Sequence, residues 1–289
     1  MEKQSMQAEI HVASLEEVAV IIDWAEREGW NPSPYDAKAF FSADPKGFFV
    51  STMNDIPIGA ISAVKWGSNF GFLGLYIVKP EYRAKGFGIQ LWNHAMGYLS
   101  HCLIGLDGVV EQQYNYKKSG FILAHNTIRF EGRAGDVSQF AHGGNIIAYE
   151  KDMFGGVLHY DKGFFPASRK NFLANWLSIP KASVHVAFDE KGAVSGYVLA
   201  RPCKRGYKIA PLFADNATIA RGLLHEVCAP LPKDAPVFLD VPEPNKNAQS
   251  LIAELGWREV FQTARMYTAS PPPDIQLQKS FGLTSFEIG

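Results

Sequence analysis

Apolar and polar residues alternate along the chain with two different periods, which predict strands and helices in close succession. An apolar run over 73–78, LGLYIV, is typical of a buried strand. Pro80 ends this strand, because proline cannot donate a hydrogen bond to a sheet. Apolar residues then recur with the period of a helix, and one predicted face carries Ile89, Trp92, Met96 and Leu99. The pattern therefore predicts a strand, a short glycine loop and a helix.

The segments around this central unit follow the same two periods. Ser14 and Glu17 form a capping box, which predicts a helix that ends near residue 28. The dipeptide Asn54-Asp55 separates two apolar stretches and predicts a hairpin. A strand, a helix and a further strand are then predicted over 101–107, 110–118 and 121–130.

The second half of the chain repeats the first at a nearly constant offset. Three dipeptides, Leu106-Asp107, Gly120-Phe121 and Arg129-Phe130, are echoed by Leu239-Asp240, Gly256-Trp257 and Arg265-Met266. The glycine and the arginine are nine residues apart in both halves, which indicates a tandem duplication. We therefore predict two domains, 1–140 and 141–289.

The second copy lacks the residues that distinguish the central unit of the first. Where the glycine loop should recur, residues 210–216 read APLFADN, with neither glycine nor arginine. Ile252 occupies the position that corresponds to Tyr116. The second domain is therefore expected to be a degenerate copy that cannot work as the first does.

Composition and charge exclude several classes of function. The chain has 289 residues, a formal net charge of −1 and a pI near 6.7, so it has no basic surplus for nucleic acid or an anionic membrane. Its three cysteines lack a CxxC spacing and are expected in the core of a cytoplasmic protein. No apolar run approaches the ~18 residues of a membrane span. The apolar end, 280–289, is expected to dock on the protein, and the oligomeric state is left open.

The loop after the central strand has the features of an anion site. The free N–H groups of the helix's first turn point into it, and Arg83 and Lys85 add positive charge, so a pyrophosphate is the expected ligand. The P-loop string GxxxxGK[ST] is missing, and GxGxxG fails because Leu91 stands where the third glycine should be. The chain instead reads RAKGFG over 83–88, an RxxGxG preceded by V-K-P. An ordinary turn with solvated basic residues is the alternative.

A strand, V-x-P, RxxGxG and a helix in this order resemble the acyl-CoA loop of the GCN5-related N-acetyltransferase (GNAT) superfamily. The resemblance implies an α/β (α+β) fold of two tandem domains, each with a mixed, mostly antiparallel central sheet flanked by helices. Acetyl-CoA is the implied cofactor of the first domain. The residues implied to bind it are Ile77, Val78, Arg83, Ala84, Lys85, Gly86, Phe87, Gly88, Ile89 and Asn115.

A second resemblance lies at the end of the helix predicted over 110–118. Tyr116 begins a stretch that resembles the family's Y-x-x-x-G-F, in which the tyrosine faces the sulfur of CoA. The family often has an asparagine seven residues earlier, whereas this chain has Val109, so Asn115 or Gln112 is expected to replace that contact. A phenol with a pKa of ~10 stays protonated at neutral pH, which makes Tyr116 the candidate general acid. A packing role with the hydroxyl bonded to backbone is the alternative.

The general base and the acceptor site are less clearly marked. The strand over 73–78 contains no acid, so Asp107 and Glu111, which follow the next strand, are the candidates for the base. Asp240 stands at the place of Asp107 in the second copy, and a shared role at a helix start is the alternative. In GNAT proteins the loop after the first helix lines the acceptor side, where the candidates are Trp30, Asn31, Tyr35 and Asp36. Asp36 alternatively caps the next helix.

These features together predict an acyl-CoA-dependent N-acyltransferase. It would transfer acetyl to a small amine or amino-acid-like acceptor by direct attack in a ternary complex, without a nucleic-acid or membrane partner. One alternative is a non-catalytic CoA-binding sensor, in which Tyr116 is only structural. Another is a tandem-GNAT transferase that uses aminoacyl-tRNA, which the intact RxxGxG and the lack of a basic surplus disfavour.

Overall fold

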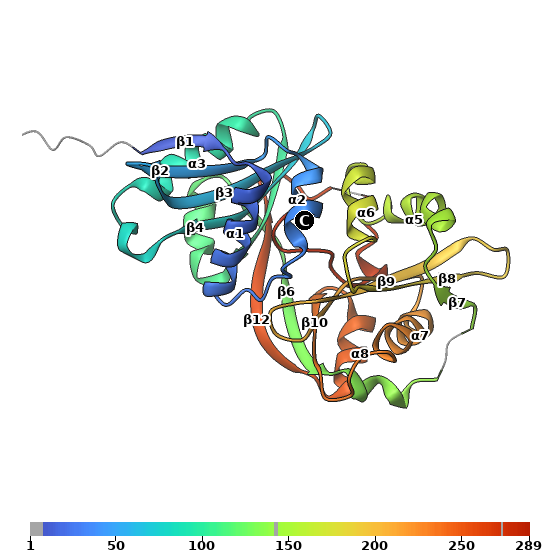
Figure 1. Cartoon of the computed structure of the whole chain (residues 1–289). Helices are drawn as coiled ribbons and strands as arrows, with labels where there is room; N and C mark the ends of the chain where they lie inside the picture. The colour runs from blue at the N-terminus through green and yellow to red at the C-terminus, as the bar shows by residue number, and fades with distance from the viewer. Residues whose placement is uncertain (1–7, 142–143, 273) are drawn as a thin grey trace, which may run out of the picture.

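The computed structural model describes residues 8–141, 144–272 and 274–289 (Figure 1). The first half of the chain contributes β1 (Glu9–Val12), α1 (Leu15–Arg27), α2 (Asp36–Ala43), β2 (Phe48–Met53), β3 (Ile56–Trp66), β4 (Phe70–Val78), α3 (Phe87–Tyr98), β5 (Leu103–Val109), α4 (Gln113–Lys118) and β6 (Ile122–Arg133). Ser14 and Glu17 form the predicted capping box of α1. Asn54 and Asp55 make the predicted hairpin turn between β2 and β3, with φ angles of 50° and 62°.

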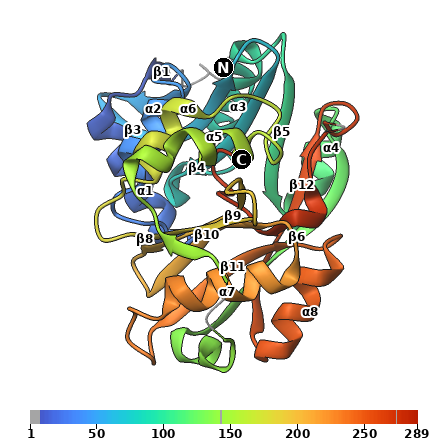
Figure 2. The same ribbon diagram turned by 90° about the vertical axis from the view of Figure 1, so that its right-hand side faces the viewer.

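The second half has a similar succession of elements. They are β7 (Ile146–Ala148), α5 (Phe154–Asp161), α6 (Lys170–Trp176), β8 (Ser183–Phe188), β9 (Val194–Pro202), β10 (Tyr207–Ala214), α7 (Ala217–Cys228), β11 (Pro236–Pro242), α8 (Lys246–Leu255), β12 (Arg258–Tyr267) and β13 (Ser280–Gly282). Asn216 and Asn245 cap α7 and α8 with their side chains. Helix α5 and helix α6 lie on one face of these strands, and α7 and α8 on the other (Figure 2).

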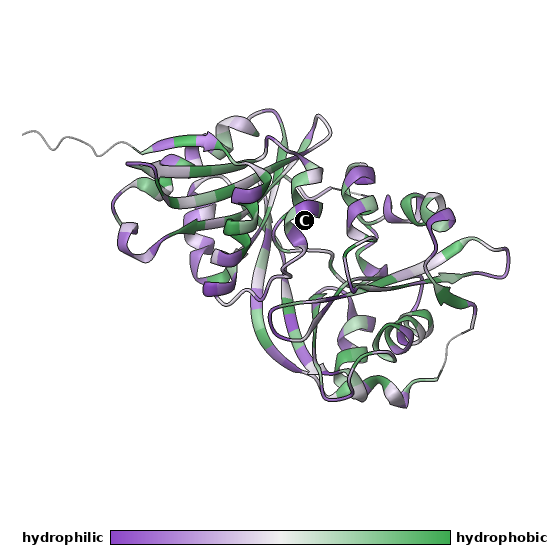
Figure 3. Cartoon of the chain, viewed as in Figure 1, coloured by the Kyte–Doolittle hydropathy of each residue, from purple (hydrophilic) through white to green (hydrophobic). Residues whose placement is uncertain are grey.

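The described strands of both halves belong to one 13-stranded sheet, in the order β1-β2-β3-β4-β5-β12-β6-β11-β10-β9-β8-β7, with β13 beside β10. Strand pairs β4–β5 and β10–β11 are parallel, and the other described pairs are antiparallel. Figure 3 shows hydrophobic residues concentrated along the strands. The predicted mixed, mostly antiparallel sheet with flanking helices is therefore confirmed.

The two halves exchange their last strands. Strand β12 of the second half lies between β5 and β6 and pairs with both, whereas β6 of the first half pairs with β11. A division of the chain at residue 140 therefore separates two strands from the halves in which they are hydrogen bonded. The proposed domain boundary stays a prediction, because the sheet runs across it.

Helix α3 packs on the strands of the first half, but only part of the apolar face predicted from the sequence is buried. Phe87, Leu91, Trp92 and Ala95 are its buried residues. Ile89, at the start of the predicted face, is 56% exposed, so that face is not buried along its whole length. Phe87, in the first turn, is buried and packs in a cluster with Ile58 of β3. None of the helices in the described residues is both long and apolar enough to cross a bilayer.

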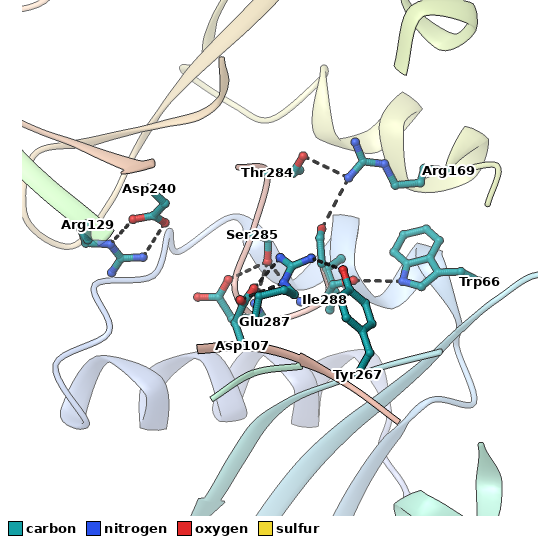
Figure 4. A network of polar contacts seen from close by, with 12 residues as sticks. Trp66, Asp107, Arg129, Arg169, Asp240, Tyr267, Thr284, Ser285, Glu287 and Ile288 are labelled. Atoms are coloured by element: carbon teal, nitrogen blue, oxygen red, sulfur yellow. Dashed lines mark hydrogen bonds and ion pairs between the residues drawn. The ribbon is translucent and has the colours of Figure 1, made fainter. Parts of the chain in front are cut away.

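The C-terminal segment runs between the halves and is buried, as its apolar composition led us to expect. Phe281 and Ile288 are fully buried. The carbonyl of Glu287 accepts a hydrogen bond from Ser62 Oγ (3.2 Å), and that of Ile288 accepts one from Trp66 Nε1 (3.0 Å) (Figure 4). A Cβ on Gly74 would lie 2.0 Å from the Glu287 carbonyl oxygen, so the segment touches the backbone of β4.

Candidate active site

The central strands separate at the place where the sequence predicts the acyl-CoA site. Parallel pairing of β4 with β5 runs from Phe70 and Leu103 to Leu73 and Leu106 and ends there. Leu75 has a φ of 45°, and the register of β4 against β3 shifts beside it. This bulge turns the end of β4 away from β5, because an extra residue bends the bulged strand. Beyond it the facing backbone groups of β4 and β5 are not paired with each other.

One amide of β4 faces this opening. Lys79 N–H donates to the Ile58 carbonyl of β3 (2.9 Å), and backbone groups of successive strand residues point to alternate sides. The N–H of Val78 is therefore directed away from β3, toward the opening. The Val78 carbonyl on the same side accepts from Arg83 Nε (2.7 Å). Ile77 has the opposite direction and a buried side chain, so of these two predicted residues Val78 is placed to polarise a carbonyl.

The glycine loop forms a backbone cradle between β4 and α3. Ala84 and Gly86 have φ angles of 58° and 91°, and such alternation of handedness turns neighbouring N–H groups inward. Gly86 is the N-cap of α3 and no side chain caps the helix, so its first N–H groups remain available to an anion. A Cβ on Gly88 would lie 2.6 Å from the Tyr76 hydroxyl, so a larger residue there would displace the tyrosine side chain.

The polar side chains of this region mainly contact other protein groups and do not project into the loop. Arg83, which is about half exposed, forms an ion pair with Glu28 at the end of α1 in addition to its bond to β4. Lys85 is exposed, with Nζ 5.7 Å from the ring centroid of Tyr82. Asn115 is also exposed and donates to Gln112 (2.7 Å). Lys85 is thus placed to reach a phosphate, while Arg83 is occupied by two protein partners.

Tyr116 stands at the opening on α4. Its ring stacks on Trp92 at a centroid distance of 5.7 Å and covers Gly108 of β5, where a Cβ would lie 2.1 Å from the tyrosine ring. Burial raises the pKa of Tyr116 to about 12, with a smaller contribution from Tyr76. No described residue hydrogen bonds to its hydroxyl, so the backbone bond of the packing alternative is missing among the residues described. The raised pKa keeps the phenol protonated at neutral pH.

Tyr76 is a site residue that the sequence reading missed. It lies on β4 beside the bulge, its ring is 5.7 Å from that of Trp92, and its hydroxyl lies over Gly88. Burial raises the pKa of Tyr76 as well. The available signal was a hydroxyl-bearing residue inside an otherwise apolar strand, two residues before V-K-P.

Asp107 has a different role from both that were predicted. Its buried carboxylate accepts from Arg265 Nε (2.9 Å) and Nη2 (2.6 Å), so each oxygen is bonded to the arginine. Burial raises the pKa of Asp107, and the adjacent guanidinium opposes the shift. It lies within β5 and caps no helix. The structure therefore supports neither a free general base nor a helix-start role, and Asp240 is paired in the same way with Arg129.

Two of the four predicted acceptor residues, Asn31 and Asp36, bond directly to the second half of the chain. Asp36 is fully buried and paired with Arg201 of β9, so it is neither open to an acceptor nor the cap of α2. Asn31 exchanges two hydrogen bonds with the backbone of Arg205, with distances of 3.0 and 2.8 Å. The Trp30 carbonyl accepts a hydrogen bond from Arg129 (3.0 Å). Tyr35 is partly buried and packs against a hydrophobic core that contains residues of both halves. The structure therefore engages Asn31 and Asp36 with the second half of the chain.

The second copy's equivalent of the opening is filled by the chain itself. Pairing of β10 with β11 ends at Ile209 and Leu239, and β13 lies next to β10 beyond that point. Leu283 N–H donates to the Asp240 carbonyl of β11 (2.8 Å), which ties the segment to the other side. Asn216 accepts from the first turn of α7, so that helix start is already capped. The space beyond the parallel strand pair and the start of the following helix are thus open in the first half. In the second half both are occupied by the chain's own residues.

A small cavity lies on the face of the sheet opposite α3, between the halves. Its volume is about 40 Å³, and its lining includes His125, Arg265, Tyr267 and aromatic rings of both halves. His125 of β6 lies opposite Arg265 of β12, which in turn lies opposite Asp107 of β5. Burial, aided by Arg265, lowers the pKa of His125 to about 3, so the imidazole is neutral.

Comparison with known sequences identifies two related regions. Residues 15–121 match the acetyltransferase (GNAT) family, and residues 157–282 match an acetyltransferase (GNAT) domain. The holothin acyltransferase of Pseudoalteromonas sp. (strain SANK 73390) is 30% identical over 278 residues, which cover 96% of this chain and 93% of that protein.

Solved structures share the fold across nearly the whole chain. A putative acetyltransferase from Pyrococcus horikoshii superposes with a TM-score of 0.79 at 20% identity, covering 100% of this chain and 98% of that one. A tandem GNAT protein from the clavulanic acid biosynthesis pathway gives 0.66 at 12% identity, with 92% and 100% covered. The likeness extends over both halves.

Proposed function

The chain belongs to the GNAT family of acyltransferases, and from this membership we propose that it transfers an acetyl group from acetyl-CoA to the nitrogen of a small amine. The difference between the two halves carries the proposal. The first half has an open separation of β4 and β5 and a helix start without a side-chain cap, whereas the second has neither. One acyl-CoA per chain, bound in the first half, is expected.

The residues fit an acyl-CoA. The inward N–H groups around Gly86 and the start of α3 suit the pyrophosphate, with Lys85 nearby. The opening between the strands suits the pantetheine arm, and acyl-CoA supplies an activated thioester. The Val78 N–H is directed to stabilise charge on the carbonyl oxygen, as oxyanion-binding donors do. Tyr116 is placed to give a proton to the departing sulfur, because its phenol remains protonated at neutral pH.

A small-molecule acceptor is favoured over a macromolecular one. The relative named holothin acyltransferase is named for acyl transfer to holothin and is similar along nearly its full length. Aminoacyl-tRNA is disfavoured because the formal net charge is −1.

Turnover measurements distinguish the enzyme from a CoA-binding sensor. Release of free thiol from acetyl-CoA is followed with a panel of amines, and calorimetry of the same sample measures acetyl-CoA binding. An enzyme releases thiol only with an amine present and forms the N-acetyl product by mass spectrometry. Tight binding at one site without turnover of any amine would favour the sensor.

A further inference from the structure

The hydroxyl of Tyr76 lies against the first turn of α3, at the glycine loop. A Cβ on Gly88 would lie 2.6 Å from this hydroxyl and 3.5 Å from the ring carbon that carries it. Because Cα–Cβ bonds tilt toward the N-terminus of a helix, the hydroxyl is on the side of Gly88 that faces the loop. The side chain thus reaches the helix start, where no side chain caps the free N–H groups.

The ring of Tyr76 lies between the loop and Tyr116. Its centroid is 5.7 Å from that of Trp92, and Trp92 stacks on Tyr116 at the same distance. These three residues belong to one hydrophobic cluster, on the face of the sheet that α3 covers. An acyl-CoA that extends from the loop to Tyr116 therefore passes Tyr76.

The Tyr76 hydroxyl is free to bind a ligand. No hydrogen bond joins it to another of the described residues, and the side chain is only partly buried. Burial raises the pKa of Tyr76, so the phenol stays protonated at neutral pH and can donate. Tyrosine hydroxyls away from water usually have a hydrogen-bond partner, and here a ligand in the opening can supply one.

The cations next to the loop leave room for a further donor. Arg83 is committed to Glu28 and to a carbonyl of β4. Lys85 is exposed and carries its charge on a flexible stem. Tyr76, in contrast, is held by packing against Trp92. A positioned hydroxyl that donates to a phosphate oxygen forms a charge-assisted hydrogen bond, which is stronger than one between neutral groups.

We propose that Tyr76 is a cofactor-binding residue, whose hydroxyl donates a hydrogen bond to a phosphate oxygen in the pyrophosphate of acyl-CoA. This inference rests on the proposed function, because it requires an acyl-CoA in the opening of the first half. It gives the two phenols different tasks: Tyr76 holds the donor molecule, and Tyr116 protonates its sulfur. The competing roles for Tyr76 are that of the acid itself and that of a packing residue.

Tyr76→Phe removes the hydroxyl and keeps the ring against Trp92. In calorimetry on the full chain, acetyl-CoA should bind about tenfold or more weakly, because a hydrogen bond to a charged group is lost. With saturating acetyl-CoA and an amine that the wild type acetylates, kcat should stay within about threefold. Tyr207→Phe is the matched control and should bind as the wild type does. Tyr207 is a partly buried tyrosine on β10 of the second half, and no side-chain hydrogen bond joins it to another described residue.

Acetyl-pantetheine shows which part of the cofactor the hydroxyl contacts, because it lacks the pyrophosphate and the nucleotide. With this donor, kcat/KM of Tyr76→Phe should lie within about threefold of wild type, whereas with acetyl-CoA it should fall about tenfold or more. Equal losses with both donors would place the hydroxyl at the pantetheine arm or the sulfur and would overturn the proposal.

Gly88→Ala tests the position of the hydroxyl. The added methyl group would displace the hydroxyl, so acetyl-CoA should bind several-fold more weakly. In the double variant Tyr76→Phe/Gly88→Ala the nearest ring carbon is 3.5 Å from the methyl, which is an ordinary contact. The double variant should therefore bind within about threefold of Tyr76→Phe alone. A full additional loss would show that the two residues act independently, contrary to the proposed contact.

The remaining outcomes separate this inference from the proposed function. A fall in kcat of Tyr76→Phe without a change in acetyl-CoA affinity would make Tyr76 the acid and overturn the inference. Unchanged affinity together with unchanged kcat would leave Tyr76 only a packing role and overturn it too. Failure of the wild type to bind acetyl-CoA would instead contradict the proposed function itself.

Discussion

Asp107 of β5 and Arg265 of β12 form a bidentate ion pair across the two halves, with Nη2 2.6 Å from Oδ2 and Nε 2.9 Å from Oδ1. The equivalent residues, Asp240 and Arg129, form the same kind of pair. Here the aspartate comes from the second half and the arginine from the first. Both arginines lie on the exchanged strands, β6 and β12. The ion pairs and the strand exchange are therefore one feature, which joins the two halves of the chain.

Removing one member of a crossed pair should destabilise the fold. Asp107→Asn leaves Arg265 buried without its counter-ion, which typically costs about 3–5 kcal/mol, and Asp240→Asn should cost a similar amount. Urea denaturation measures both. The double variant Asp107→Leu/Arg265→Met should recover most of the loss, because an apolar pair removes both charges. An unchanged unfolding free energy in Asp107→Asn together with lost turnover would restore Asp107 as a base.

Acetyl-CoA should bind one site per chain, at the loop around Gly86. Gly86→Glu puts a negative charge in the cradle and should lower the affinity by at least about tenfold in calorimetry. Gly192→Glu is the matched control, because both glycines have positive φ and open space around a Cβ. The control should lose similar stability but keep its affinity. Two sites per chain, or equal binding by both variants, would contradict the assignment.

Tyr116→Phe should lower kcat by about 10²- to 10⁴-fold and leave acetyl-CoA affinity nearly unchanged. The ring still stacks on Trp92, and only the acidic hydroxyl is lost. Tyr114→Phe is the control on the same helix, since Tyr114 is 70% exposed. Because the pKa of Tyr116 is raised to about 12, wild-type kcat should not fall through its ionisation below about pH 10. A Phe variant within about threefold of wild type would exclude Tyr116 as the acid.

His125 should make the fold sensitive to acid. Its pKa is lowered to about 3 in the folded state, so between about pH 6.5 and 3 the unfolded chain binds a proton that the folded chain does not. Stability should fall with decreasing pH in this window, by at most about 1.4 kcal/mol per unit from this group. Urea midpoints of His125→Gln should fall less than those of wild type, whereas the exposed His101→Gln should behave like wild type. Equal slopes would refute the buried neutral state.

The halves should not fold separately. Residues 1–141 lack β12, so the edge of β5 would be unpaired, and residues 144–289 lack β6 beside β11. We expect each fragment alone to aggregate or remain unfolded, and the two refolded together to form a 1:1 complex. Size-exclusion chromatography and circular dichroism give the result. A folded, monomeric 1–141 fragment would show that the exchanged strand is dispensable.

The local features of the protein could be predicted from the sequence. The capping box at Ser14, the hairpin at Asn54 and the RxxGxG loop depend on a few neighbouring residues, whose side chains and backbone angles act over one turn. The strand–loop–helix unit and the position of Tyr116 beside it were predicted from local sequence patterns of the same kind. The duplication could also be predicted, because similar residues recur at matching positions of the two halves.

The pairing between the copies was decided only by the tertiary structure. Asp107 and Asp240 are equivalent, as are Arg129 and Arg265, so pairing within a copy and across copies satisfies the same local pattern. The choice depends on where the strands lie, which is set by long-range packing. The same packing engaged Asp107 and Asp36 with arginines and turned Tyr76 toward the loop at the Leu75 bulge. The sequence alone determined the glycine loop over 83–88, and the tertiary structure decided which acids are engaged by arginines.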